Sequence, residues 1–185
     1  MYKIVEYTAQ IDIDHYLKDY VDISTFLEYC KQCPNYNQIW SCPSYDFDVE
    51  EYWKQYKHLH LYGRQIIFDN ATRTRTYTEE GMNQLLKHVL SKEKQILAEQ
   101  LFALETENPG SISLSAGNCQ YCGKDNCSKK ENQPCRYPDK MRYSIESLGG
   151  NVGKTISNLF HIELEWMEEG KLPSHFVLVS GLLTK

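Results

Sequence analysis

Seven cysteines fall in two short segments of this chain, and their spacing constrains the loops that any fold must contain. The first segment has the pattern C-x2-C-x8-C-P and contains Cys30, Cys33 and Cys42. The second has the pattern C-x2-C-x4-C-x7-C and contains Cys119, Cys122, Cys127 and Cys135. Thiols that short loops bring this close together usually either hold a soft metal or form disulfides.

The composition predicts one soluble domain. The chain has 185 residues, of which 41% are hydrophobic and 24% are charged, and these values are ordinary for a globular protein. This length is sufficient for one sizeable core, so we expect residues 1–185 to form a single metal-binding domain. The net charge of -5 gives no reason to expect binding to nucleic acid.

The expected compartment is the cytosol. The residues from Met1 to Tyr7 contain no long apolar run, so no signal peptide is predicted. No stretch approaches the roughly 20 apolar residues of a membrane span. Thiols stay reduced in the cytosol, and an odd number of cysteines cannot all pair within one chain. Both arguments favour metal ligands over disulfides.

The periodicity of apolar residues predicts an α+β or small α/β fold, in which a few-stranded sheet carries flanking helices. We expect strands at residues 2–8, 58–68, 111–115, 162–166 and 176–183. We expect helices at residues 13–29 (one or two of them), 49–57, 77–107 and 139–148. Thr76 followed by Glu79 predicts a capping box at the start of the longest helix. The two cysteine-rich metal loops then lie at the rim of the sheet.

The spacing of the second segment favours an iron–sulfur cluster. Its C-x2-C pair, Cys119 and Cys122, lets two sulfurs point at one centre. Structural zinc sites usually repeat that short spacing, whereas seven residues separate Cys127 from Cys135. Four cysteines on unequal spacings fit a 4Fe–4S cluster, because a cubane accepts ligands from a longer, wrapping loop. Zinc is the alternative metal.

The first segment lacks a fourth cysteine, and three interpretations follow. It predicts a second iron–sulfur cluster with one iron open or capped by another group, a Cys3His zinc site, or thiols without metal. His58 and His60 are the candidates for the histidine, since their spacing places them on one face of a strand. An open iron is a place where a substrate binds as a Lewis base, so this segment is the better candidate for chemistry.

Three cations follow Cys135 in the sequence: Arg136, Lys140 and Arg142. Cations beside a cluster favour its reduced, more negative state. The competing interpretation is a solvated basic surface.

The chain resembles a family of uncharacterised predicted metal-binding proteins that is common in anaerobic bacteria and archaea. The resemblance extends from about Cys30 to Val152. Its marks are Cys30-x2-Cys33, Trp40-Ser41-Cys42-Pro43, Ala116-Gly117-Asn118-Cys119, Cys122, Cys127, Cys135-Arg136-Tyr137-Pro138 and Ser144-Ile145-Glu146-Ser147-Leu148-Gly149. The family tends to have histidine at Tyr137 and proline at Tyr143. The resemblance implies metal binding and no particular reaction.

These observations predict an iron–sulfur protein that transfers electrons or serves as accessory to a redox enzyme. Its cofactors are then one or two 4Fe–4S clusters, and its expected partner is a redox protein. One alternative is a zinc-stabilised interaction module. Another is an enzyme whose substrate binds an open iron of the three-cysteine segment.

Overall fold

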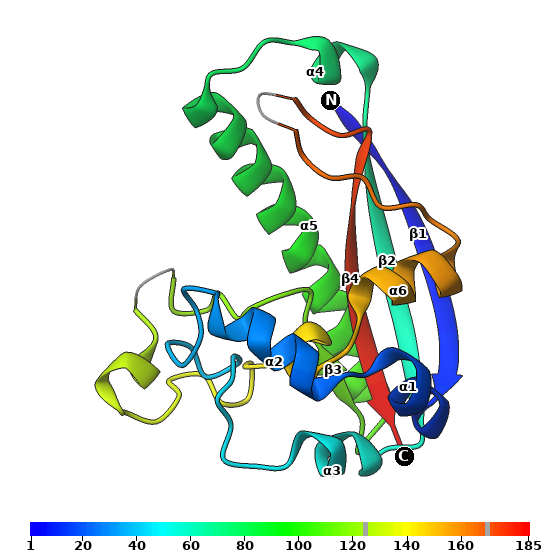
Figure 1. Cartoon of the computed structure of the whole chain (residues 1–185), viewed down its shortest axis with the longest axis vertical. Coiled ribbons are helices and arrows are strands. Elements are labelled where there is room, and N and C mark those ends of the chain that lie inside the picture. The colour runs from blue at the N-terminus through cyan, green and yellow to red at the C-terminus, as the bar shows by residue number, and fades with distance from the viewer. Residues whose placement is uncertain (124–125, 169–170) are drawn as a thin grey trace.

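A four-stranded antiparallel sheet forms the centre of the molecule (Figure 1). The computed structural model describes residues 1–123, 126–168 and 171–185. The strands are β1 (Tyr2–Asp12), β2 (His58–Phe68), β3 (Ile112–Leu114) and β4 (His175–Thr184). Their order in the sheet is β1-β2-β4-β3, so β1 lies at one edge, as predicted. The predicted α+β class is confirmed.

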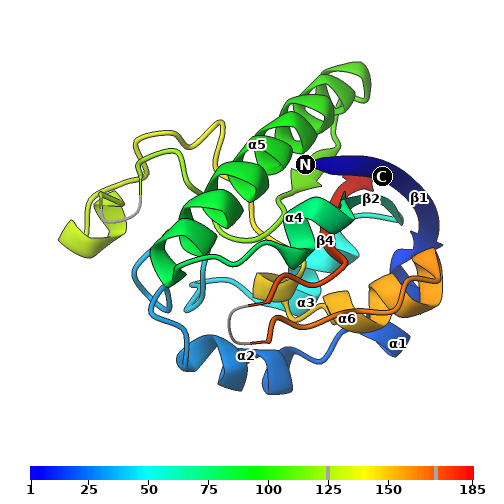
Figure 2. The ribbon, with the colours of Figure 1, turned by 90° about the horizontal axis from the view of Figure 1, so that it is seen from above.

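Helices flank this sheet on both faces. They are α1 (Ile13–Tyr20), α2 (Ile23–Lys31), α3 (Val49–Lys54), α4 (Asn70–Thr74), α5 (Glu79–Glu107) and α6 (Val152–Thr155). The described residues also form three short helical turns: η1 (Ser128–Glu131), η2 (Glu146–Leu148) and η3 (Ile156–Phe160). Figure 2 shows α5 on one side of the sheet and α1 with α6 on the other.

Two hydrophobic cores lie on the opposite faces of the sheet, and β2 contributes to both. Side chains alternate between the faces of a strand. Leu59 and Leu61 therefore pack into the core that contains Tyr16 and Trp53. Ile66 and Phe68 pack into the other core, beneath α5.

A buried polar network joins the sheet to α5. Glu93 on α5 accepts hydrogen bonds of 2.6 Å from Arg64 Nε and 2.6 Å from the Tyr2 hydroxyl. Arg64 also donates to Glu6 at 2.6 Å, at the more exposed edge of the sheet. Burial by itself raises the pKa of the Glu93 carboxyl, but the bonds from Tyr2 and Arg64 outweigh it and the pKa lies below its ordinary value.

The predicted helix at residues 139–148 is wrong, since only η2 is helical within it. The backbone there pairs with another segment: the Tyr143 carbonyl accepts a 2.8 Å hydrogen bond from the Ser115 N–H, and Ser144 forms a parallel bridge with Ser115. These contacts hold the backbone of Tyr143 and Ser144 against Ser115 in place of a helical turn.

The predicted strand at residues 162–166 is also wrong. His161 adopts a left-handed conformation with φ of 56°, which turns the chain after η3. Within the described part of the chain, residues 162–166 join no sheet, although Ile162 is buried and Trp166 is 82% exposed. The start of α5 differs as well, because Thr78 and not Thr76 caps it, accepting from the Gly81 N–H.

None of the helices within residues 1–123, 126–168 and 171–185 combines the length and the apolar character needed to cross a bilayer.

Candidate metal centre

The first cysteine segment begins on α2 and continues through a series of hydrogen-bonded turns. Cys30 lies in the last turn of α2, and the Cys33 N–H donates to its carbonyl at 3.0 Å. Cys42 is held by a similar turn, in which its N–H donates to the Ile39 carbonyl at 3.0 Å. Cys30 and Cys42 are half-buried, whereas Cys33 is exposed.

The three thiols of the first segment influence one another electrostatically. The pKa of the Cys42 thiol is raised to about 11, mainly by burial and then by the charges of Cys33 and Cys30, although Ser41 and Lys129 act in the opposite direction. Burial and then the charge of Cys33 raise the pKa of the Cys30 thiol. The structure therefore brings the three predicted ligands into one neighbourhood.

The second cysteine segment leaves the sheet after β3 and returns to η2. Its four cysteines are all half-buried. Burial raises the pKa of the Cys119 thiol, and the charges of Cys135, Cys122 and Cys127 add to the increase, so these four side chains also share one neighbourhood. Between the last two cysteines, the Ser128 hydroxyl donates to the Pro134 carbonyl at 2.8 Å, which closes the loop around η1.

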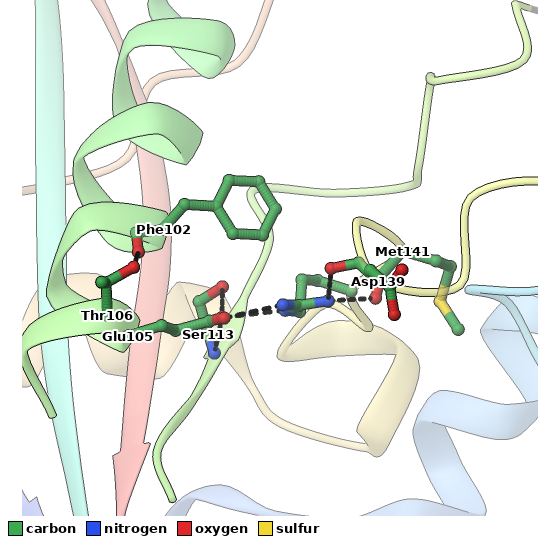
Figure 3. Close-up of polar contacts among 7 residues, drawn as sticks. Phe102, Glu105, Thr106, Ser113, Asp139 and Met141 are labelled. Carbon is green, nitrogen blue, oxygen red and sulfur yellow. Dashed lines mark hydrogen bonds and ion pairs between the residues drawn. The ribbon is translucent and has the colours of Figure 1, made fainter. Parts of the chain in front are cut away.

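A salt bridge anchors the end of this segment to α5. Arg142 donates to both carboxylate oxygens of Glu105, at 2.8 and 2.7 Å, and Figure 3 shows Ser113 of β3 donating to the same carboxylate. Arg142 also donates to the carbonyls of Asp139 and Met141, each at 2.9 Å. Arg142 is therefore a structural anchor and not the solvated surface charge of one interpretation, since its side chain is only 13% exposed; its role as a cation beside a cluster stays a prediction.

The two cysteine segments contact each other. The Cys119 N–H donates to the Ser41 hydroxyl at 3.0 Å, and the Trp40 indole N–H donates to the Gln133 carbonyl at 3.1 Å. Because consecutive Cα atoms are 3.8 Å apart, the first bond keeps the Cα atoms of Cys42 and Cys119 within about 11 Å. Figures 1 and 2 both show the segments projecting on the same side of the molecule, away from β1.

Two partly buried titratable residues lie beneath these loops. Glu146 in η2 has a buried carboxylate oxygen that makes no hydrogen bond to the described residues, and burial raises the pKa of its carboxyl. Burial lowers the pKa of the Lys94 ammonium on α5, whose Nζ lies 3.1 Å from where a Cβ on Gly117 would stand. Besides burial and Cys33, the charge of Glu146 raises the pKa of Cys30. In the sequence, only the motif Ser144 to Gly149, one of the marks of the family resemblance, pointed to Glu146.

The donor types suit a metal, although the side chains are not gathered around one point. All seven cysteines are free thiols, and thiolates are the usual ligands of iron–sulfur clusters and of many zinc sites. In the described ranges 1–123, 126–168 and 171–185, no three His, Cys, Asp or Glu side chains lie close enough together to hold an ion. Residues 124 and 125, between Cys122 and Cys127, lie outside these ranges.

The histidine candidates for the first segment have other partners. His58 Nδ1 lies 2.8 Å from a carboxylate oxygen of Asp12, and His60 Nε2 lies 3.2 Å from the Thr184 hydroxyl. Both contacts lie at the end of the sheet where β2 begins. The Cys3His arrangement therefore remains a prediction that no contact of these two side chains supports.

Substituting Ser41 tests the contact between the segments. We expect Ser41→Ala to speed hydrogen exchange at the Cys119 amide and to lower the free energy of unfolding by about 1 kcal/mol, because a half-buried N–H loses its acceptor. Exchange followed by mass spectrometry and urea unfolding measure the two effects. Ser24→Ala, which removes an exposed 2.9 Å bond to Asp22, is the control. Equal behaviour of the two variants would mean that the segments are not joined through Ser41.

Comparison with known proteins identifies one family. The profile of a family described as "Predicted metal-binding protein (DUF2284)" matches residues 17–184. Searches of curated proteins and of solved structures found no match.

Proposed function

Since this chain belongs to the DUF2284 family of predicted metal-binding proteins, we propose that it is an iron–sulfur protein that carries electrons or assists a redox enzyme. The observation that supports this most is the set of four half-buried thiols in one loop. The charges of the other three cysteines raise the pKa of Cys119. Four thiols in one wrapping loop are the ligand set of a cubane cluster.

The residues of each segment have separable tasks in this proposal. One cluster would be held by Cys119, Cys122, Cys127 and Cys135, and a second by Cys30, Cys33 and Cys42. A bound cluster supplies one-electron redox chemistry. The chain itself positions the thiols through the Ser41 contact and the Arg142 anchor, and partial burial limits the access of water. The partner we propose is a redox protein.

Metal analysis of anaerobically purified protein tests the proposal. We expect a brown protein with broad visible absorption, and about four iron atoms for each cluster. Cys119→Ser is expected to remove the iron of the second segment, and Cys42→Ser that of the first. A colourless protein that contains stoichiometric zinc and takes up no iron on reconstitution would refute the iron–sulfur assignment and support a zinc-stabilised module.

An enzymatic role is a second candidate, favoured by the first segment. Only three thiols lie there, and Cys33 is exposed, so a metal at this place would keep a position open to solvent. A small added ligand such as cyanide is then expected to change the spectrum of wild-type protein and not that of Cys42→Ser. A wild-type spectrum that ignores the ligand argues against a substrate at this centre.

A further inference from the structure

Lys129 connects the two cysteine segments. It lies in η1, between Cys127 and Cys135, and belongs to the second segment. Its Nζ donates to the carbonyls of Cys42 and Ser44 in the first segment, at 3.1 and 3.2 Å. The positive charge therefore lies against the backbone of Cys42, a proposed ligand of the first segment. Lys129 itself is two residues after Cys127, a proposed ligand of the second segment.

Lys129 is partly shielded from solvent. Its Nζ lies 5.5 Å from the centroid of the Trp40 ring, which the Gln133 carbonyl fixes. Lys129 as a whole is partly buried between these groups. A charge acts more strongly on its neighbours where water is excluded, because the effective dielectric constant is lower.

The three cations that follow Cys135 have different contacts. Arg142 bonds to Glu105, and Arg136 donates to the Asn126 carbonyl and lies 3.7 Å from Glu131. Lys140 lies over the Tyr121 ring, with its Nζ 5.9 Å from the ring centroid. These contacts are with α5 or within the second segment, so Lys140, a lysine that lies over an aromatic ring of its own segment, is the matched control.

We propose that Lys129 is an electrostatic residue shared by both cysteine groups, and that its charge favours the reduced state of a metal centre at each. This inference rests on the proposed iron–sulfur function. A reduced cluster carries one more negative charge than an oxidised one, so a fixed cation between two such centres stabilises the reduced form of both. The two reduction potentials then depend on one side chain.

The test compares three variants under anaerobic conditions: Lys129→Gln, Lys129→Arg and Lys140→Met. Glutamine retains an N–H donor for the two carbonyls but removes the charge, whereas arginine retains the charge. Redox titration followed by electron paramagnetic resonance reports each centre. We expect Lys129→Gln to lower the reduced-to-oxidised ratio of both centres on the order of tenfold at a fixed potential. Lys129→Arg and Lys140→Met are expected to leave both ratios near those of wild type.

Iron content and the midpoint potentials separate the possible failures. Wild-type protein without iron overturns the proposed function, and the shared role falls with it. Two clusters with unchanged potentials in Lys129→Gln, or a shift in one centre alone, overturn the shared role and leave the function intact. A wild-type protein with a single cluster also overturns the shared role. Loss of metal in both Lys129→Gln and Lys129→Arg assigns the residue a structural task and overturns the proposal as well.

Discussion

Arg142→Met is expected to lower the free energy of unfolding by about 3 to 5 kcal/mol at pH 7, because it leaves the Glu105 carboxylate of a largely buried ion pair without its charged partner. The side chains of Arg142 and Glu105 are only 13% and 14% exposed. Ser113 would remain as a partner of the carboxylate, but a hydroxyl and an amide supply no countercharge. Urea unfolding followed by circular dichroism measures the loss.

The same substitution also frees the end of the second cysteine segment. Arg142 holds the carbonyls of Asp139 and Met141, so amide exchange over residues 137–143 is expected to accelerate in the variant. Arg136→Met is the matched control, since Arg136 is 50% exposed and its carboxylate partner is 69% exposed. We expect it to change the free energy of unfolding by less than about 0.5 kcal/mol. Similar losses in both variants would show that the anchor has no special role.

Arg64→Met is expected to have a comparable effect, also about 3 to 5 kcal/mol at pH 7. Among the described residues, it leaves the Glu93 carboxylate, whose side chain is 2% exposed, with the Tyr2 hydroxyl as its hydrogen-bond donor. Lys87→Met, on the exposed face of α5, is the control and is expected to change little. If Arg64→Met combined with Glu93→Leu fails to recover most of the loss, the unpaired carboxylate is not its cause.

The pH dependence of Arg64→Met has a definite sign. In wild type the pKa of Glu93 is lowered, so its contribution to stability is present above the unfolded-state pKa and is lost as the pH falls through the folded-state pKa. Without Arg64, burial dominates and raises that pKa, so the variant gains stability relative to wild type as the pH falls from 7 toward 4. Unfolding free energies at these two pH values check this. A constant difference between the proteins would contradict it.

Elements with strong periodicity were predictable from the sequence. The patterns of residues 58–68 and 176–183 gave the central strands β2 and β4, and that of 77–107 gave α5. Prediction failed where a distant segment competes for the backbone. Residues 139–148 have helical spacing, but Tyr143 and Ser144 pair with the backbone of Ser115 instead.

The candidate site was predictable in its parts and not in its assembly. Cysteine spacing placed Cys30 with Cys33, and Cys119 with Cys122, because short loops limit the distances between thiols. No local sequence pattern predicts the hydrogen bond between the Ser41 hydroxyl and the Cys119 amide, because the two residues are 78 positions apart in the chain. The contacts of Lys129 could not be predicted for the same reason, because its hydrogen-bond partners lie in the first segment.

The position of β4 in the sheet has a consequence for the order of events during synthesis. β4 pairs with both β2 and β3, yet it follows both cysteine segments in the chain. A growing polypeptide therefore displays all seven thiols before the strand that completes the sheet has been made, and pairing across so long a separation is slow. Under the proposed function, a metal would meet these thiols while the chain is still open, so we expect a chelator to act more effectively during folding than after it.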